Sequence, residues 1–254
     1  GTLQAGYTKF HYLNPKWRET CERGALLGVS MTGIASGTVM NLDLEEAADA
    51  AKATNSTVSN LLGIRAAERI TCIKPAGTTS LVLGTSSGVH AWHAPFYKRR
   101  MRAGKDEALA KYMVRVAPEL VEQDSMVPHQ YVLSFPQKAP TGAIMRDENM
   151  FDLLERVKKI SMDWVQNGHR TGDNCHNVSC TISVREEEWE ELTEWMWKNK
   201  EFYNGISVLP YDAGTYVQAP FEDISEEEYN TLLPHLEGIF IGDVYEDSGK
   251  DVNL

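Results

Sequence analysis

The chain has 254 residues, of which 42% are hydrophobic and 24% are charged, and its formal net charge is -11. This composition is typical of a globular protein, and the acidic balance argues against a protein that coats nucleic acid, because phosphate-binding surfaces normally carry a basic excess. No apolar run approaches the roughly 20 residues of a membrane span, and no signal-peptide pattern opens the chain. Four cysteines are too few for a disulfide scaffold, which favours reducing, cytoplasmic surroundings.

Short apolar segments alternate with helix-favouring segments along the chain. Strand-like runs stand at 26–32, 70–74, 131–135 and 178–184, and Pro75 and Pro136 halt the second and third of them. Helices are predicted at 44–62, 78–83, 106–116 and 148–166, with Gly63 as a C-cap of the first and Gly168 ending the last. This alternation predicts an α/β protein with much parallel sheet.

The last third of the chain continues the pattern. An acidic helix carries Trp189, Leu192 and Met196 on one side, and Trp189 is expected to pack in the core. A turn at Asn204 and Gly205 precedes the run 206–209, and Ser225 with Glu228 forms a capping box for a final helix. No repeat or linker marks a boundary, so residues 1–254 are expected to form one domain.

The most informative stretch is the turn that follows the strand at 70–74. Lys74-Pro75-Ala76-Gly77-Thr78-Thr79-Ser80 leads from this strand to a helix start through a glycine and small hydroxyl residues. Free amides at a helix N-terminus favour anions, and small side chains let a phosphate approach. The spacing is not that of a Walker A loop. The alternative is an ordinary strand-to-helix turn capped by Thr78 or Thr79.

Four blocks in the same order resemble the ribonucleotide reductase large chain. They are residues 27–34 (LGVSMTGI), 71–100 with TCIKPAGT, GTSSGVH and YKRR, 177–182 (NVSCTI), and 207–220 with SVLPY and QAP. The chain looks most like the class II, adenosylcobalamin-dependent ribonucleoside triphosphate reductases. The resemblance covers most of the chain and implies the C-terminal portion of a ten-stranded α/β barrel made of two five-stranded halves.

The resemblance also implies an activity. Such enzymes replace the ribose 2'-hydroxyl of a ribonucleotide by hydrogen through a thiyl radical, with adenosylcobalamin as cofactor and a thioredoxin-like reductant as partner. Carried over by position, the substrate's phosphates fall on Ala76, Gly77, Thr78, Thr79 and Ser80. The alternatives are a fragment of a class I type large chain and a noncatalytic nucleotide-binding module of the same fold.

The chain departs from the family pattern at the catalytic cysteines. The finger-loop signature Asn-Pro-Cys-Gly-Glu is absent, as are the upstream cysteine of the reducing dithiol and the tail with its cysteine pair, since the sequence ends at Asp251-Val252-Asn253-Leu254. We therefore assign no catalytic residue to this chain. We expect it to require an N-terminal complement that carries the catalytic cysteines, because a parallel sheet cut open exposes unpaired edges.

Other clusters receive structural interpretations. Cys175 and Cys180 lie near His169 and His176, but burial of Cys180 as a small hydrophobic residue is favoured over a metal or dithiol site. His90, Trp92 and His93 are expected to form a packed loop. The basic residues Lys98, Arg99, Arg100, Arg102 and Lys105 are expected to pair with nearby acids.

Overall fold

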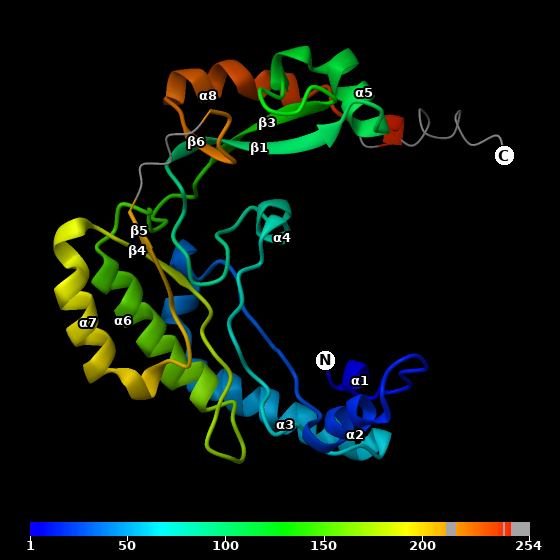
Figure 1. Ribbon diagram of the computed structural model, residues 1–254, viewed down its shortest axis with the longest axis vertical. Coiled ribbons are helices and arrows are strands. Elements are labelled where there is room, and N and C mark those ends of the chain that lie inside the picture. The colour runs from blue at the N-terminus through cyan, green and yellow to red at the C-terminus, as the bar shows by residue number, and fades with distance from the viewer. Residues whose placement is uncertain (212–216, 241, 245–254) are drawn as a thin grey trace. The chain divides into compact units, whose positions relative to one another are not determined.

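A computed structural model describes residues 1–211, 217–240 and 242–244, with Thr78 described by its backbone only (Figure 1). The chain divides into two compact units, one made of residues 1–92 and 142–211 and the other of 93–141 and the described residues from 217 onward. Both units are assembled from separate stretches of sequence. This explains why no single linker in the sequence marks a boundary between them.

The first unit contains most of the helices and a parallel sheet. Its helices are α1 (Thr2–Ala5), α2 (Pro15–Gly24), α3 (Leu44–Leu62), α4 (Thr78–Val82), α6 (Met150–Ile160), which continues into a π-helix (Ser161–Gln166), and α7 (Trp189–Lys198). Its strands are β4 (Thr181–Val184) and β5 (Ser207–Pro210). Short 3-10 turns lie at Ile34–Ser36, Val39–Asn41, Glu186–Glu188 and Lys200–Phe202.

The sheet of the first unit is longer than its two regular strands. Parallel bridges join Val29 to Thr71 and Ile73 to Val178, and β4 pairs in parallel with β5. Four parallel segments therefore lie in the order 27–29, 69–73, 178–184 and 207–210. Helix α3 connects the first to the second, α6 precedes the third, and α7 connects the third to the fourth (Figure 1). This is the strand-helix alternation that the sequence predicted.

The helices of the first unit follow from their caps and apolar stripes. The Asp43 side chain accepts the Glu46 amide at the start of α3, and Gly63 ends this helix in the left-handed conformation. In α6 the buried residues repeat every three or four positions, as a helix that covers a sheet requires. They are Met150, Leu153, Leu154, Val157 and Ile160, and they form one core with Ile73, Val178 and Ile182 of the sheet.

The second unit is an antiparallel sheet with helices. Its strands are β1 (Phe96–Gly104), β2 (Val121–Gln123), β3 (Gln130–Lys138) and β6 (Phe221–Asp223), in the order β2-β3-β1-β6. Its helices are α5 (Ala108–Val116) and α8 (Glu226–Leu232), with 3-10 turns at Pro118–Leu120 and Leu233–Leu236. The core of this unit gathers around Tyr112, Met113, Leu120 and Leu133.

Two local predictions were wrong. Pro136 does not halt its strand: it pairs opposite Lys98 inside β3, beyond the part of β3 that β2 covers, so its missing N–H leaves no gap on that side. Trp189 is 41% exposed, whereas Trp195 is 8% exposed and packs in the core with Leu192. Trp189 opens α7, and side chains at a helix start lean back over the preceding turn.

Two further predictions hold only in part. The segments 26–32 and 70–74 are extended, but single bridges and not continuous ladders connect them. Ser225 caps α8 by accepting the Glu228 amide, while the Glu228 carboxylate binds Lys98 of β1 and does not return to the cap.

Among the described residues, no helix combines the length and the apolar character needed to cross a membrane.

Candidate functional site

The predicted phosphate turn lies at the surface of the first unit, where it follows the sheet segment 69–73 and includes the first residues of α4. Lys74, Pro75, Gly77 and Thr79 are exposed, whereas Ser80 is buried. Gly77 has φ +55° and ψ -129°, and a Cβ placed on it would meet nothing within 4 Å. The turn thus requires glycine for its backbone and leaves open space before it.

The turn is held by three hydrogen bonds. The Gly77 amide donates to Ser87 Oγ at 3.2 Å, the Thr79 amide donates to the Ala76 carbonyl at 3.2 Å, and Ser80 Oγ donates to the Gly77 carbonyl at 2.7 Å. The prediction of a row of bare amides is therefore wrong for Gly77 and Thr79. Among the described groups of 76–80, the Ala76 and Ser80 amides and the Thr79 hydroxyl remain as donors, and the side chain of Thr78 lies outside what the structure describes.

A second loop, residues 84–90, packs against the turn. Gly88 has φ +56°, and a Cβ there would lie 2.9 Å from the Lys74 carbonyl oxygen. The Thr32 hydroxyl donates to the Ser86 carbonyl at 2.8 Å and accepts the Gly88 amide at 2.9 Å. Sequence reasoning assigned no role to this loop beyond packing, because nothing in its composition shows which of its hydroxyls reaches the turn.

Cys180 is buried, and the rings of His169 and His176 contact backbone carbonyls. No group of three metal-ligating side chains occurs in the described part of the chain. Burial raises the pKa of the Cys180 thiol to about 11, and the His176 ring contacts the Leu27 carbonyl at 2.7 Å. All four cysteines are free thiols. The interpretation of Cys180 as a buried small residue is confirmed.

Of the five basic residues at 98–105, three pair with acids, as predicted, and two do not. Lys98 lies 2.9 Å from both Glu222 and Glu228, and Arg102 lies 2.8 Å from Asp124. Arg100 forms ion pairs with Glu122 and Glu222, and the remaining two cations stack, Arg99 on Phe221 and Lys105 on Tyr131. These cations hold the second unit together, and we do not assign them to an anionic ligand.

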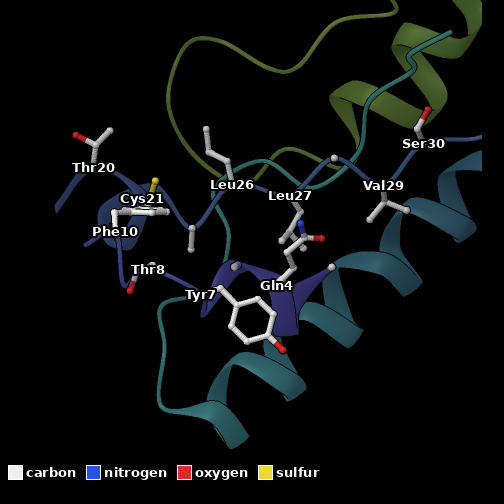
Figure 2. Close-up of a pocket in the computed structure, with 14 residues that line it drawn as sticks. Gln4, Tyr7, Thr8, Phe10, Thr20, Cys21, Leu26, Leu27, Val29 and Ser30 are labelled. Atoms are coloured by element: carbon white, nitrogen blue, oxygen red, sulfur yellow. The ribbon is translucent and has the colours of Figure 1, made fainter. Parts of the chain in front are cut away.

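A separate pocket of about 720 Å³ opens in the first unit beside the segment 26–30. Figure 2 shows Leu26, Leu27 and Val29 along one side of it and Gln4 and Tyr7 on the other. Its lining is mostly apolar, with hydroxyls, one amide and the Cys21 thiol, so it offers no pair of groups for acid–base catalysis. The predicted phosphate turn does not line it.

The pocket borders a free sheet edge. The Leu27 and Val29 amides bind the Arg69 and Ile70 carbonyls on one side of this segment. The amide and carbonyl of Gly28 have no hydrogen-bond partner among the described residues. In a parallel sheet, such groups bind the next strand.

Comparison with known proteins shows what this chain is similar to. No protein-family model matches it. The adenosylcobalamin-dependent ribonucleoside-triphosphate reductase of Euglena gracilis is 30% identical over 233 residues, which is 85% of this chain and 30% of that protein. The same enzyme of Lactobacillus gasseri is 27% identical over 71% of this chain and 24% of that protein. A probable enzyme of this kind from Dictyostelium discoideum is 27% identical over 94% of this chain and 31% of that protein.

The fold agrees with the sequence likeness. A crystal structure of a B12-dependent, class II ribonucleotide reductase matches 93% of this chain and 36% of its own length, with a TM-score of 0.74 and 19% identity. The chain spans less than a third of the length of these curated relatives. In sequence and in fold, the chain is therefore homologous to one part of the adenosylcobalamin-dependent, class II ribonucleotide reductases, as its motifs predict.

Proposed function

We propose that the chain is part of a ribonucleotide reductase that converts ribonucleotides to 2'-deoxyribonucleotides, and that the turn 76–80 holds the phosphates of the substrate. The observation that carries the activity is the 30% identity to a named reductase over 85% of the chain. The turn supports the site, because it is exposed, is built on a glycine with φ +55°, and keeps small or hydroxyl side chains.

The role of the turn follows from its chemistry. Amide and hydroxyl donors bind phosphate oxygens without adding charge or bulk, so the ribose can be held at a fixed distance from the reacting groups. Displacement of a substrate by about 1 Å can cost on the order of a hundredfold in rate. The turn would thus contribute orientation, while the thiyl radical would come from a cysteine that this chain does not carry.

The relatives are named for their dependence on adenosylcobalamin, and we propose the same cofactor for the complete enzyme. When bound, it supplies the radical chemistry that protein side chains cannot perform. The pocket beside segment 26–30 contains no histidine in its lining. No residue among those described is proposed to hold the cofactor.

We further propose partners for this chain. An N-terminal complement would supply the catalytic cysteines and cover the free edge at Gly28, a thioredoxin-like reductant would restore the dithiol, and the enzyme would work in the cytoplasm. Two observations support the proposal of a complement. The sheet edge at Gly28 is open, and the chain matches only 30% of the length of the Euglena gracilis relative. A reading frame upstream that contains Asn-Pro-Cys-Gly-Glu is the expected finding, and an upstream sequence unrelated to reductases would contradict it.

Calorimetric titration tests the phosphate site with CTP and with cytidine, which lacks the phosphates. We expect the chain to bind CTP more tightly than cytidine and Gly77→Trp to remove that difference, because the indole fills the space before the turn. Gly63→Trp is the matched control, since Gly63 also has a positive φ and open surroundings but lies at the end of α3. Equal binding of CTP and cytidine by the unchanged chain would refute the phosphate site.

A further inference from the structure

We propose that Ser87 and His90 are positioning residues that tie the phosphate turn to strand β4. This inference rests on the proposed function of the turn and extends it to two residues outside 76–80. Neither residue is proposed to contact the substrate. Their role would be to hold Gly77 in the conformation that leaves the turn open.

Four hydrogen bonds connect the turn to the sheet. The Gly77 amide donates to Ser87 Oγ at 3.2 Å, and the Ser87 carbonyl lies 3.1 Å from both the backbone nitrogen and Nδ1 of His90. The amide of Thr181, the first residue of β4, donates to His90 Nε2 at 3.0 Å. The path runs from a regular strand through one imidazole and one serine to the glycine of the turn.

The ring of His90 can fill this place in one protonation state only. A backbone amide always donates, so Nε2 must accept and carries no proton. The proton of the neutral ring therefore resides on Nδ1, which donates to the Ser87 carbonyl. Burial and the nearby Arg156 guanidinium lower the pKa of His90, although the bond to Ser87 opposes them, and the neutral ring is thereby favoured.

The hydrogen bonds that fix loop 84–90 do not involve the Ser87 hydroxyl. Loop 84–90 is already fixed by the Thr32 hydroxyl and by the Gly33 and Ile34 amides, which bind the Ser86 and Gly88 carbonyls. The hydroxyl of the preceding residue, Ser86, is buried without a partner among the described residues. Of these two adjacent serines, only Ser87 reaches the turn, and its hydroxyl links the two loops.

Hydrogen exchange of the Gly77 amide tests the link in the full chain without any ligand. Loss of one such bond is typically worth about fivefold, so Ser87→Ala should speed exchange at Gly77 about fivefold, whereas Ser87→Thr should keep it slow. His90→Gln retains an acceptor toward Thr181, and His90→Leu does not, so the second variant should show the faster exchange. Ser86→Ala is the control and should leave Gly77 unchanged.

The binding of CTP, compared with that of cytidine, distinguishes a positioning role of Ser87 and His90 from a merely structural one. We expect Ser87→Ala and His90→Leu to weaken CTP binding about fivefold and to leave cytidine binding unchanged, with rescue by Ser87→Thr and His90→Gln. Unchanged or tighter CTP binding in Ser87→Ala would overturn the inference, because the freed Gly77 amide would then be serving the phosphate. If the unchanged chain fails to distinguish CTP from cytidine, the proposed function fails, and the positioning role fails with it. If CTP is preferred but Gly77 exchange does not respond to Ser87→Ala, only the positioning role fails.

Discussion

At the residue scale, a buried ion pair supports the loop that packs against the turn 76–80. Arg156 of α6 and Glu148 are only 5% and 10% exposed, and they share two contacts. Arg156 also donates to the Val89 carbonyl at 3.1 Å, so α6 holds the loop that contains Ser87 and His90. The pair therefore connects the core helix to the candidate site.

Arg156→Leu is expected to destabilise the protein by about 3–5 kcal/mol, because it leaves the Glu148 carboxylate buried without its counter-charge. The free energy of unfolding in urea is the measurement. The double variant Arg156→Leu/Glu148→Leu should be less destabilised than the single one. Glu194→Gln is the control, since its pair with Lys198 is exposed on α7. Equal losses from Arg156→Leu and from Glu194→Gln would contradict the argument.

His90 predicts a pH dependence of stability. Its pKa is lowered in the folded chain, chiefly by burial, from an unfolded value of about 6.5. Below pH 6.5 the unfolded ring takes up a proton that the folded ring excludes, so its contribution to stability is complete above that pH and declines as the pH falls toward the folded pKa. Between pH 7.5 and 5.5, urea unfolding should reveal a larger loss for the unchanged chain than for His90→Gln. The same loss in both would show that His90 does not titrate in this way.

Residue-level reasoning singled out the turn that we propose to bind phosphate, but it did not show the contacts that hold this turn. A glycine that follows a buried strand and precedes small hydroxyl residues is visible in a sequence, so Gly77 could be named. The bond from Gly77 to Ser87 depends on how two loops meet in space, and Ser86 and Ser87 are indistinguishable in the sequence. For the same reason the sequence could not show that Ser87 occupies the Gly77 amide.

At the scale of elements, Gly168 lets the end of the π-helix approach the sheet. A Cβ on Gly168 would lie 1.8 Å from Thr71 Oγ1, which donates to the Trp164 carbonyl at 2.7 Å. Gly168 also offers its carbonyl to the Ile70 amide at 3.1 Å. The glycine predicted to end this helix thus has a second role, which is close packing against segment 69–73.

Gly168→Ala should destabilise the chain by about 1–3 kcal/mol, the usual cost of overpacking a site whose neighbours cannot move away. The midpoint of thermal unfolding and the free energy of unfolding in urea would measure it. Gly238→Ala serves as the comparison, because a Cβ there meets nothing within 4 Å. A loss as small as that of Gly238→Ala would mean that Thr71 can rotate away at little cost.

Helices could be predicted from the sequence more closely than strands. The bounds of α3 were predicted correctly because its apolar pattern and its C-cap, Gly63, are local signals. Strand pairing is not local: the segments 26–32 and 70–74 meet distant partners through single bridges, and Pro136 is tolerated because β2 ends before it. The face of α7 was misassigned because the pattern alone did not show which tryptophan meets the core.

At the scale of the whole molecule, the sequence supplied the relationship to ribonucleotide reductases but not the division into two units. The motifs that carry the relationship occur in four ordered blocks, so they do not depend on knowing the fold. The second unit could not be seen, because its parts at 93–141 and from 217 onward are separated by residues of the first unit.

The open sheet edge predicts self-association of the isolated chain. Leu26 is half exposed beside the unpaired Gly28 amide, and exposed apolar edges pair with other strands. Leu26→Lys should lower the fraction of dimers and larger species in sedimentation velocity without changing the far-ultraviolet circular dichroism. Leu61→Lys is the control, because Leu61 is exposed on a helix. If the unsubstituted chain is a monodisperse monomer, the sheet edge at Gly28 does not cause self-association.

The pairing of β6 with β1 has a consequence for synthesis on the ribosome. Tyr97 in β1 lies opposite Asp223 in β6, and all of 142–211 is translated between them. The β1–β3 ladder of the nascent chain therefore has one edge uncovered until β6 emerges, while the first unit can complete its own core in that interval. Pausing of translation within that interval would prolong exposure of β1, so chaperone capture of the nascent chain should concentrate there.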